Sequence, residues 1–179
     1  RLRVLDLLGR AVRVHEADGN VREFAHDGEG NVVHARDRLH DVCFTYRGMN
    51  RLASRSEAGT SVRFVYDTEE QLTSIVNEHG AVYRFVLGPT GQVDEEHGFE
   101  GLMRKYRRDA AGRVLRVDRP GARFSEYKYD AAGRVVLVTH ADGSEESYAY
   151  AADGSLVKAS NSDCTLEFMR DALGRVTRE

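Results

Sequence analysis

The 179-residue sequence has no tryptophan, only two prolines and two cysteines, and no long hydrophobic run. No stretch approaches the roughly 18 uninterrupted apolar residues of a membrane helix, so we expect no membrane span. The 26 basic and 29 acidic residues alternate in sign and leave a net charge of −3, which gives no field to attract nucleic acid. We expect Cys43 and Cys164 to be half-buried strand residues without a disulfide, since they lie far apart in the sequence.

Glycine, with 17 residues, is abundant and recurs at a fixed interval. The segment DAAGRV occupies residues 109–114 and occurs again at 130–135. Counting outward gives nine anchor positions spaced 20 or 21 residues apart: 6, 27, 47, 67, 88, 109, 130, 151 and 171. We therefore expect a single array over 1–179 with eight consecutive repeats of about 21 residues. The sequence starts in the middle of the pattern, so we expect a fragment of a larger chain.

Three positions relative to each anchor define the register of the repeat. The third residue after the anchor is glycine at seven of the nine anchors: Gly9, Gly30, Gly91, Gly112, Gly133, Gly154 and Gly174, with Asn50 and Glu70 at the other two. The fifth residue after every anchor is small or branched and apolar. The third residue before each anchor from 27 onward is aromatic: Phe24, Phe44, Phe64, Phe85, Tyr106, Tyr127, Tyr148 and Phe168.

Each repeated residue type has a physical role in a tight turn. An anchor aspartate is expected to accept hydrogen bonds from backbone N–H groups two or three residues later, and the glycine supplies a positive φ. The arginine after the glycine is expected to lie against a neighbouring carboxylate or aromatic ring. These arginines are Arg10, Arg51, Arg113, Arg134 and Arg175.

A second reversal near the middle of each repeat completes the pattern. It is marked by Asp18-Gly19, Gly59, Gly80, Gly101, Pro120-Gly121 and Asp142-Gly143. Between the reversals lie segments of strand length that are rich in Val, Tyr, Phe and Thr, so each repeat is predicted to be one β-hairpin. The fold class is therefore all-β, with tandem hairpins forming a curved, spiralling antiparallel sheet of roughly 16 strands. The aromatic residues are expected to form a ladder, packing on one another and on the apolar residue after Gly-Arg.

No motif for metal binding, cofactor binding or catalysis is apparent. His15, His97 and His140 lie near mid-repeat turns of separate repeats, and His26, His34 and His40 are scattered over a strand end, a strand and a turn. Close metal-ligand spacings, calcium loops, a nucleophile elbow and a phosphate-binding loop are all missing. We therefore expect no metal, no cofactor and no enzyme.

Residues 127–135, YKYDAAGRV, resemble the YD repeat of the Rhs family. The resemblance extends over the whole chain, although Arg47, Gly88 and Ala151 replace the anchor aspartate. It implies a spiralling hairpin shell, which encloses a C-terminal toxin domain in bacterial Rhs proteins and toxin-complex subunits and supports adhesion in teneurins. The Asp-Pro-x-Gly signature of the family's self-cleavage site does not occur, so the resemblance implies shell wall alone.

The resemblance implies a structural shell segment of a bacterial, secreted or cell-surface polymorphic toxin. The implied partners are the rest of the shell, an enclosed C-terminal toxin and components of a secretion system. The alternative is an adhesion or carbohydrate-binding module whose exposed rings stack on sugars. The rings in question are Tyr46, Tyr66, Tyr129 and Tyr150, which share a face with the aromatic ladder and so favour packing over binding.

Overall fold

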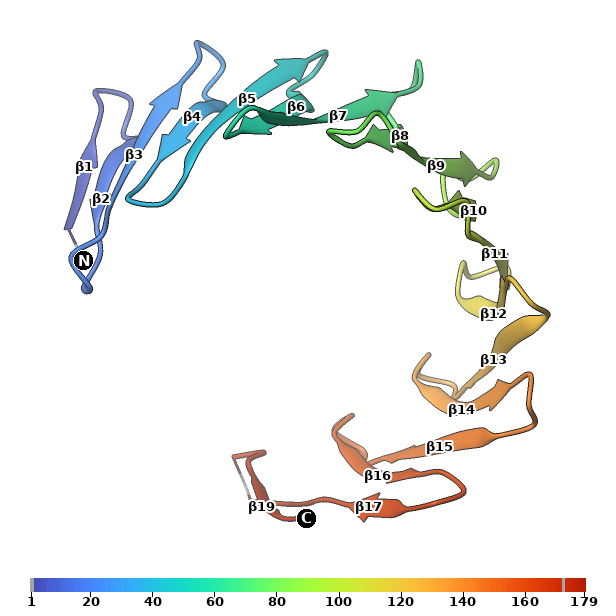
Figure 1. Cartoon of the computed structure of the whole chain (residues 1–179). Helices are drawn as coiled ribbons and strands as arrows, with labels where there is room; N and C mark the ends of the chain where they lie inside the picture. Colours follow the sequence, from blue (N-terminus) through green and yellow to red (C-terminus); the bar gives the residue numbers. More distant parts are fainter. Residues whose placement is uncertain (1, 172) are drawn as a thin grey trace. The chain divides into compact units, whose positions relative to one another are not determined.

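The computed structural model describes residues 2–171 and 173–179, which contain β-strands and turns but no helix (Figure 1). The strands are β1 (Leu2–Leu5), β2 (Ala11–His15), β3 (Val21–His26), β4 (Val32–Arg36), β5 (Asp41–Arg47), β6 (Arg51–Glu57), β7 (Thr60–Tyr66), β8 (Leu72–Val76), β9 (Val82–Leu87), β10 (Val93–His97), β11 (Met103–Arg108), β12 (Val114–Arg119), β13 (Arg123–Tyr129), β14 (Val135–His140), β15 (Glu145–Tyr150), β16 (Leu156–Ser160), β17 (Thr165–Glu167), β18 (Met169–Arg170) and β19 (Val176–Arg178). No described segment is a helix long and apolar enough to cross a membrane.

From β1 to β9 and from β10 to β17, each strand pairs antiparallel with the next strand in the sequence. β1 to β17 belong to one sheet of 17 strands, and β18 pairs with β19. The chain divides into two compact units, residues 1–85 and 86–179, and each is described by itself. Every interval between successive anchors holds one hairpin, and the last of these has its second strand split at Phe168 into β17 and β18. The predicted all-β fold of antiparallel hairpins is therefore confirmed.

A β-bulge recurs beside the anchors in both units. The pairing register shifts between the second and the first residue before an anchor, as at Val65/Tyr66 in the first unit and Lys128/Tyr129 in the second. The mid-repeat hairpins, such as β12–β13, pair without such a shift. Because a bulge bends its strand and increases the local twist, a bulge at one end of successive hairpins accounts for the curvature within each unit (Figure 1).

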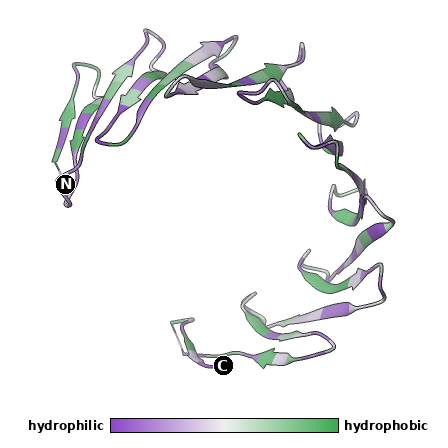
Figure 2. Cartoon of the chain, in the orientation of Figure 1, coloured by the Kyte–Doolittle hydropathy of each residue, from purple (hydrophilic) through white to green (hydrophobic). Residues whose placement is uncertain are grey.

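Each unit is a single layer, so burial comes from neighbouring side chains on the same face. Among the described residues, the buried ones are Val14, Val42, Val117, Val138 and Ser125. Half-buried and exposed positions alternate along strands such as β9 and β15, and Figure 2 shows hydrophobic and hydrophilic residues interspersed along the ribbon. The apolar face is therefore shielded mainly by lateral packing between strands.

The aromatic ladder differs from the prediction. All eight aromatic residues are half-buried, but successive rings stand on every second strand, and adjacent strands are about 4.8 Å apart. The intervening strand therefore fills the space between them. The direct cross-strand partners are Ala35 for Phe24, Arg55 for Phe44, Ile75 for Phe64, Val117 for Tyr106, Val138 for Tyr127 and Ala159 for Tyr148.

The apolar residue after Gly-Arg has a different neighbour from the one expected. Val135 lies opposite Tyr129, and Leu156 lies opposite Tyr150. Its partner is thus the residue immediately before the anchor and not the ladder residue. The bulge moves this partner by one residue, because the register of Tyr127–Val138 and Lys128–Leu137, continued without a shift, would place Val135 opposite Asp130.

Candidate functional site: the turns that join the repeats

The anchor turns, where one repeat passes into the next, hold the side-chain interactions that the repeats share. At Asp130 the carboxylate Oδ1 accepts hydrogen bonds from the backbone N–H groups of Ala132 and Arg134, each at 2.9 Å. The Gly133 N–H instead donates to the Asp130 carbonyl at 3.0 Å. The carboxylate therefore closes the turn by accepting from the N–H groups of the residues two and four positions later. We predicted donors two or three positions later, so the prediction was wrong for the second bond.

The same pair of bonds recurs at Asp6, Asp27, Asp67, Asp109 and Asp171. The predicted turn glycines all have φ between 75° and 92°: Gly9, Gly30, Gly91, Gly112, Gly133, Gly154 and Gly174. The two replacements, Asn50 and Glu70, adopt the same left-handed region with φ of 61° and 60°. The turn at Glu70 keeps the backbone bond from residue 70 to the Asp67 carbonyl, at 3.2 Å, whereas the turn at Asn50 has a second positive φ, 53° at Gly48.

The arginine after the turn glycine fastens one repeat to the next. Arg134 Nε donates to Asp130 Oδ2 at 2.7 Å, and Nη1 donates to the Ala151 carbonyl, at the following anchor, at 3.2 Å. The guanidinium carbon lies 4.7 Å from the centre of the Tyr150 ring, within cation–π range. The Tyr150 hydroxyl in turn donates to the Val135 carbonyl at 2.9 Å. We call the set of Asp130, Arg134, Tyr150 and the Ala151 carbonyl the repeat staple.

The tyrosines before the anchors make the same backbone bond throughout. Their hydroxyls donate at 2.7 to 2.9 Å to carbonyls on the first strand of the same repeat: Tyr46 to Val32, Tyr66 to Leu52, Tyr129 to Val114 and Tyr150 to Val135. Each of these rings is half-buried. The four tyrosines therefore act as links between strands, which leaves less of each ring for stacking on a sugar.

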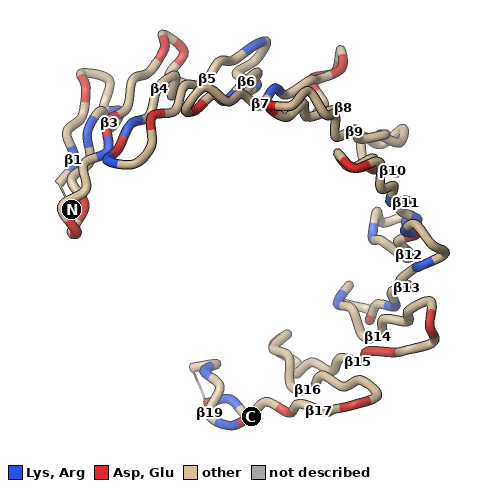
Figure 3. Tube along the Cα trace, in the orientation of Figure 1, with Lys and Arg blue, Asp and Glu red and all other residues tan. Residues whose placement is uncertain are grey.

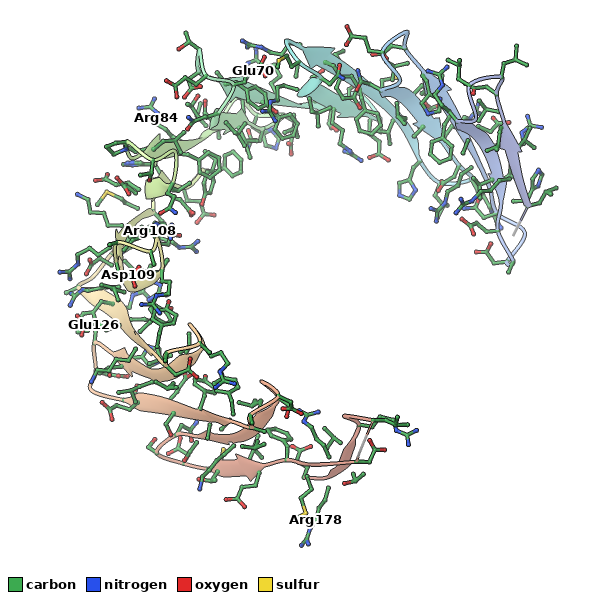
Figure 4. All side chains as sticks on the ribbon, turned by 180° about the vertical axis from the view of Figure 1, so that it is seen from behind. Glu70, Arg84, Arg108, Asp109, Glu126 and Arg178 are labelled. Atoms are coloured by element: carbon green, nitrogen blue, oxygen red, sulfur yellow. The ribbon has the colours of Figure 1, made fainter. Side chains whose placement is uncertain are left out.

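Arginine replaces the tyrosine at two anchors and keeps the link. Arg108, labelled beside Asp109 in Figure 4, donates through Nη2 to the Val93 carbonyl at 3.1 Å and through Nη1 to the Gly112 carbonyl at 3.2 Å. Arg170 donates in the same way to the Leu156 carbonyl at 3.3 Å. A donor that reaches the start of the first strand of the same repeat is thus the property common to both residue types.

The predicted arginines hold carboxylates on both sides of the turns. Arg10, Arg113 and Arg175 each donate Nε to their own anchor aspartate at 2.7 to 2.8 Å. Arg51, whose anchor is an arginine, instead lies 3.4 Å from Glu70 of the next repeat. The Glu70 carboxylate also accepts from the Met49 N–H at 3.0 Å (labelled in Figure 4). Where the anchor aspartate is missing, the next repeat thus supplies the carboxylate.

The turns at Asp109 and Asp130 favour the ionised form of these two carboxylates. The backbone N–H of Arg134 and its guanidinium lower the pKa of Asp130, and the guanidinium of Arg113 is the largest cause that lowers the pKa of Asp109. Lys and Arg alternate with Asp and Glu along both units (Figure 3). These charged side chains therefore lie in the turns and on the strand faces, and they do not gather into a patch of one sign.

A polar network around the buried Ser125, which we did not expect from the sequence, joins β12, β13, β14 and β15. Ser125 is 2% exposed, and its Oγ lies 3.0 Å from His140 Nδ1 and 2.9 Å from Arg119 Nη1. His140 Nε2 lies 3.1 Å from Glu146 Oε1. The Tyr148 hydroxyl donates to Glu146, which lowers the pKa of Glu146 and raises that of Tyr148 to about 12.

Ser125, His140 and Glu146 have the serine–histidine–carboxylate order of an acyl-transfer triad. Pattern searches missed them because the three residues come from three strands and meet only through the register of the sheet. A nucleophile must be reached by its substrate, and Ser125 is buried with its oxygen already bonded to a guanidinium. The arrangement therefore functions as a packed hydrogen-bond network.

The histidines and cysteines lie mostly where the sequence placed them, with one correction. His15, His97 and His140 end strands β2, β10 and β14, whereas His26 ends β3 and His40 lies in a turn. Cys43 and Cys164 are both free, but they are exposed, so the prediction of half-burial was wrong. Cys43 stands on an uncovered face of the single-layer sheet, and Cys164 lies in a turn. His34, Asp41 and Cys43 come together, with their ligand atoms all within 4.8 Å of one another.

Comparison with known proteins finds a repeat family and a relative that match parts of this chain. The family profile described as RHS Repeat matches residues 108–145, which include two anchors. Double-stranded DNA deaminase toxin A of Burkholderia cenocepacia (strain H111) is 30% identical over 117 residues, which are 64% of this chain. That segment is 8% of the relative's length, so the chain corresponds to a small part of it.

Solved structures of Tc toxins share the fold. The crystal structure of TcdB2-TccC3 without its hypervariable C-terminal region superposes on 98% of this chain with a TM-score of 0.73 at 14% identity. A Tc holotoxin pore of Photorhabdus luminescens superposes on 98% with a TM-score of 0.63 at 11% identity. The chain covers 11% and 12% of those two chains. The repeats, the profile match over residues 108–145 and the toxin relative support an Rhs/YD-repeat family for this chain.

Proposed function

We propose that this chain is a wall segment of an Rhs-type toxin shell, and that the shell encloses a C-terminal toxin domain in the intact protein. The proposal takes residues 1–179 as one repeat array within a longer chain. The observation that carries it is the single-layer sheet of hairpins, which extends over 98% of the chain in the match to the Tc toxin structure. A long sheet of this kind tends to curl, so it is suited to enclose a space. As a single layer it has little bulk with which to fill that space.

The local chemistry supports a mechanical role for the repeats. The hydrogen bond from Arg134 to the Ala151 carbonyl connects one repeat to the next, and the contacts of Arg134 with Asp130 and Tyr150 lie within a repeat. The bulge next to each anchor bends the sheet in the same place in successive hairpins. The turn that holds the staple contacts thus lies next to the bulge that bends the sheet. The residues of this chain provide a passive container, and the proposal assigns them no catalytic step.

The relatives suggest where such a protein acts and what it meets. One relative is named a toxin, and the structures of similar fold are toxin complexes, one of them described without a hypervariable C-terminal region. We take this protein to be secreted with its toxin. Its partners are the remaining shell and the enclosed domain, and secretion-system components are expected to handle the assembly.

The carbohydrate-binding alternative has less support. It relies on Tyr46, Tyr66, Tyr129 and Tyr150 as stacking platforms, and all four hydroxyls are bonded to backbone carbonyls. Arg134 also lies over the Tyr150 ring. A sugar would have to displace these contacts before it could stack. The tyrosines therefore favour a structural role.

Limited proteolysis of the full-length protein with mass spectrometry tests the proposal. We expect the region that follows the repeats to resist protease in the native protein and to be digested once denaturant has unfolded the repeats. The same region expressed without the repeats serves as the control, since it should be cleaved under native conditions. Rapid cleavage of that region in the native full-length protein would contradict enclosure and would favour an open array.

A further inference from the structure

We propose that His34, Asp41 and Cys43 form a binding site for a transition-metal dication of the Zn²⁺ type. Their ligand atoms, one nitrogen, one oxygen and one sulfur, all lie within 4.8 Å of one another. His34 Nε2 already contacts Asp41 Oδ1 at 2.5 Å. The site is independent of the shell proposal, because it lies within one hairpin of the first unit.

The register of the β4–β5 hairpin brings the three ligands together. His34 on β4 lies directly opposite Cys43 on β5, and Asp41 stands two residues before Cys43 on the same strand. Residues two apart in a strand share a face, so all three side chains project from the side of the sheet opposite Phe44. Linear metal motifs did not reveal the set, because its spacing is produced by the turn at 37–40.

The turn that sets this register is itself firmly held. The Asp37 carboxylate accepts from the backbone N–H groups of Leu39 and His40 at 2.8 and 2.9 Å. The Asp37 N–H donates to the His40 carbonyl at 2.8 Å. The ligands therefore stand on two strands whose offset is fixed before any metal arrives, which lowers the cost of assembling a site.

The donor set suits zinc or cobalt better than calcium or magnesium. Thiolate and imidazole are ligands of the borderline and soft metals, whereas calcium and magnesium take oxygen alone. Zinc bonds of about 2.0 to 2.3 Å in a tetrahedron place ligand atoms about 3.3 to 3.6 Å apart. The His34–Asp41 contact must open by about 0.8 Å, and the widest separation must close by about 1.2 Å, which side-chain rotations on an exposed face allow.

Three protein ligands leave the fourth position of a tetrahedron to water. The side chains of His34 and Asp41 are 40% and 59% exposed, and Cys43 is exposed, so an ion has direct access from solvent. Binding breaks the S–H bond of Cys43, the proton passes to buffer, and the thiolate sulfur bonds to the metal. The Arg36 Nε, 3.7 Å from Asp41 Oδ2, is the cation that such an ion must displace or tolerate.

Cobalt titration of the full chain under reducing conditions tests the site. We expect a thiolate-to-cobalt charge-transfer band that saturates at one equivalent and that Zn²⁺ abolishes by competition. Cys43→Ser should eliminate the band, whereas Cys164→Ser, which removes the other exposed cysteine, should leave it unchanged. His34→Gln should weaken zinc binding about 100-fold or more, since even outer-shell changes cost about 10- to 100-fold. Circular dichroism verifies that each variant keeps its strand content.

Alkylation provides a readout that does not depend on the metal's spectrum. Zinc should slow the modification of Cys43 by iodoacetamide and leave that of Cys164 unaffected, and Arg36→Gln should strengthen the protection. Equal alkylation of Cys43 with and without zinc, or a charge-transfer band that persists in Cys43→Ser, would overturn the proposal. Binding that survives His34→Gln and Asp41→Asn together would also overturn it.

Discussion

The hydroxyl of Tyr150 offers a direct test of how the two strands of a repeat are held together. It donates to the Val135 carbonyl at 2.9 Å between β15 and β14. Tyr150→Phe removes this one oxygen and keeps the ring on which Arg134 lies. A hydrogen bond of this kind contributes about 0.5 to 1.5 kcal/mol, so we expect the free energy of unfolding to fall by about 1 kcal/mol.

Tyr127 is the matched control for this variant. It is half-buried like Tyr150 and lies in the same unit, and its hydroxyl has no hydrogen-bond partner among the residues that the structure describes. Tyr127→Phe should therefore change the free energy of unfolding by less than about 0.5 kcal/mol, as surface-type substitutions do. Tyr129→Phe, which removes a 2.7 Å bond to Val114, should behave like Tyr150→Phe.

Urea unfolding monitored by circular dichroism measures the difference. The midpoint should shift for Tyr150→Phe and Tyr129→Phe while the slope m stays constant, so that the change reports stability and not compactness. Equal midpoints for Tyr150→Phe and Tyr127→Phe would refute the account, because the backbone link would then contribute nothing beyond the ring.

Three further predictions concern the turns and the buried network. Gly133→Ala should lower the free energy of unfolding by about 1 to 2 kcal/mol, because Gly133 has a left-handed φ of 80°. Gly28→Ala is the control: Gly28 lies outside the left-handed region and a Cβ there meets open space, so the loss should be less than about 0.5 kcal/mol in thermal unfolding. Ser125→Ala should cost about 1 to 3 kcal/mol by leaving buried partners unbonded, and exposed Ser147→Ala should be near neutral in urea unfolding. Backbone N–H groups lower the pKa of Asp37 from 3.8 to about 2 because they stabilise its ionised form. The ionised carboxylate therefore adds to the folding stability above pH 3.8, and this addition is lost as the pH falls through 2. Asp37→Asn should flatten that part of an acid-unfolding curve.

The repeat could be predicted from the sequence because its turns are encoded locally. Aspartate followed three residues later by glycine, as at Asp130 and Gly133, needs only the neighbouring backbone to form its turn. The same logic holds at Glu70, where a non-glycine residue adopts a left-handed φ of 60°. Hairpin positions and strand order therefore follow from short-range chemistry.

Contacts across strands could not be predicted in the same way. The bulge beside each anchor shifts the register by one residue, which places Val135 opposite Tyr129 and not opposite Asp130. Ser125 and His140 meet for the same reason, since their pairing depends on the register of β13 and β14. A period of 21 residues in the sequence does not reveal a one-residue offset between paired strands.

Electron cryomicroscopy of the full-length protein tests the central claim most directly. The account predicts that the hairpin repeats form a wall around density that belongs to the C-terminal segment, and that this density disappears when the segment is deleted while the wall remains. A full-length structure in which the repeats form an open array, with the C-terminal segment outside it, would contradict the claim.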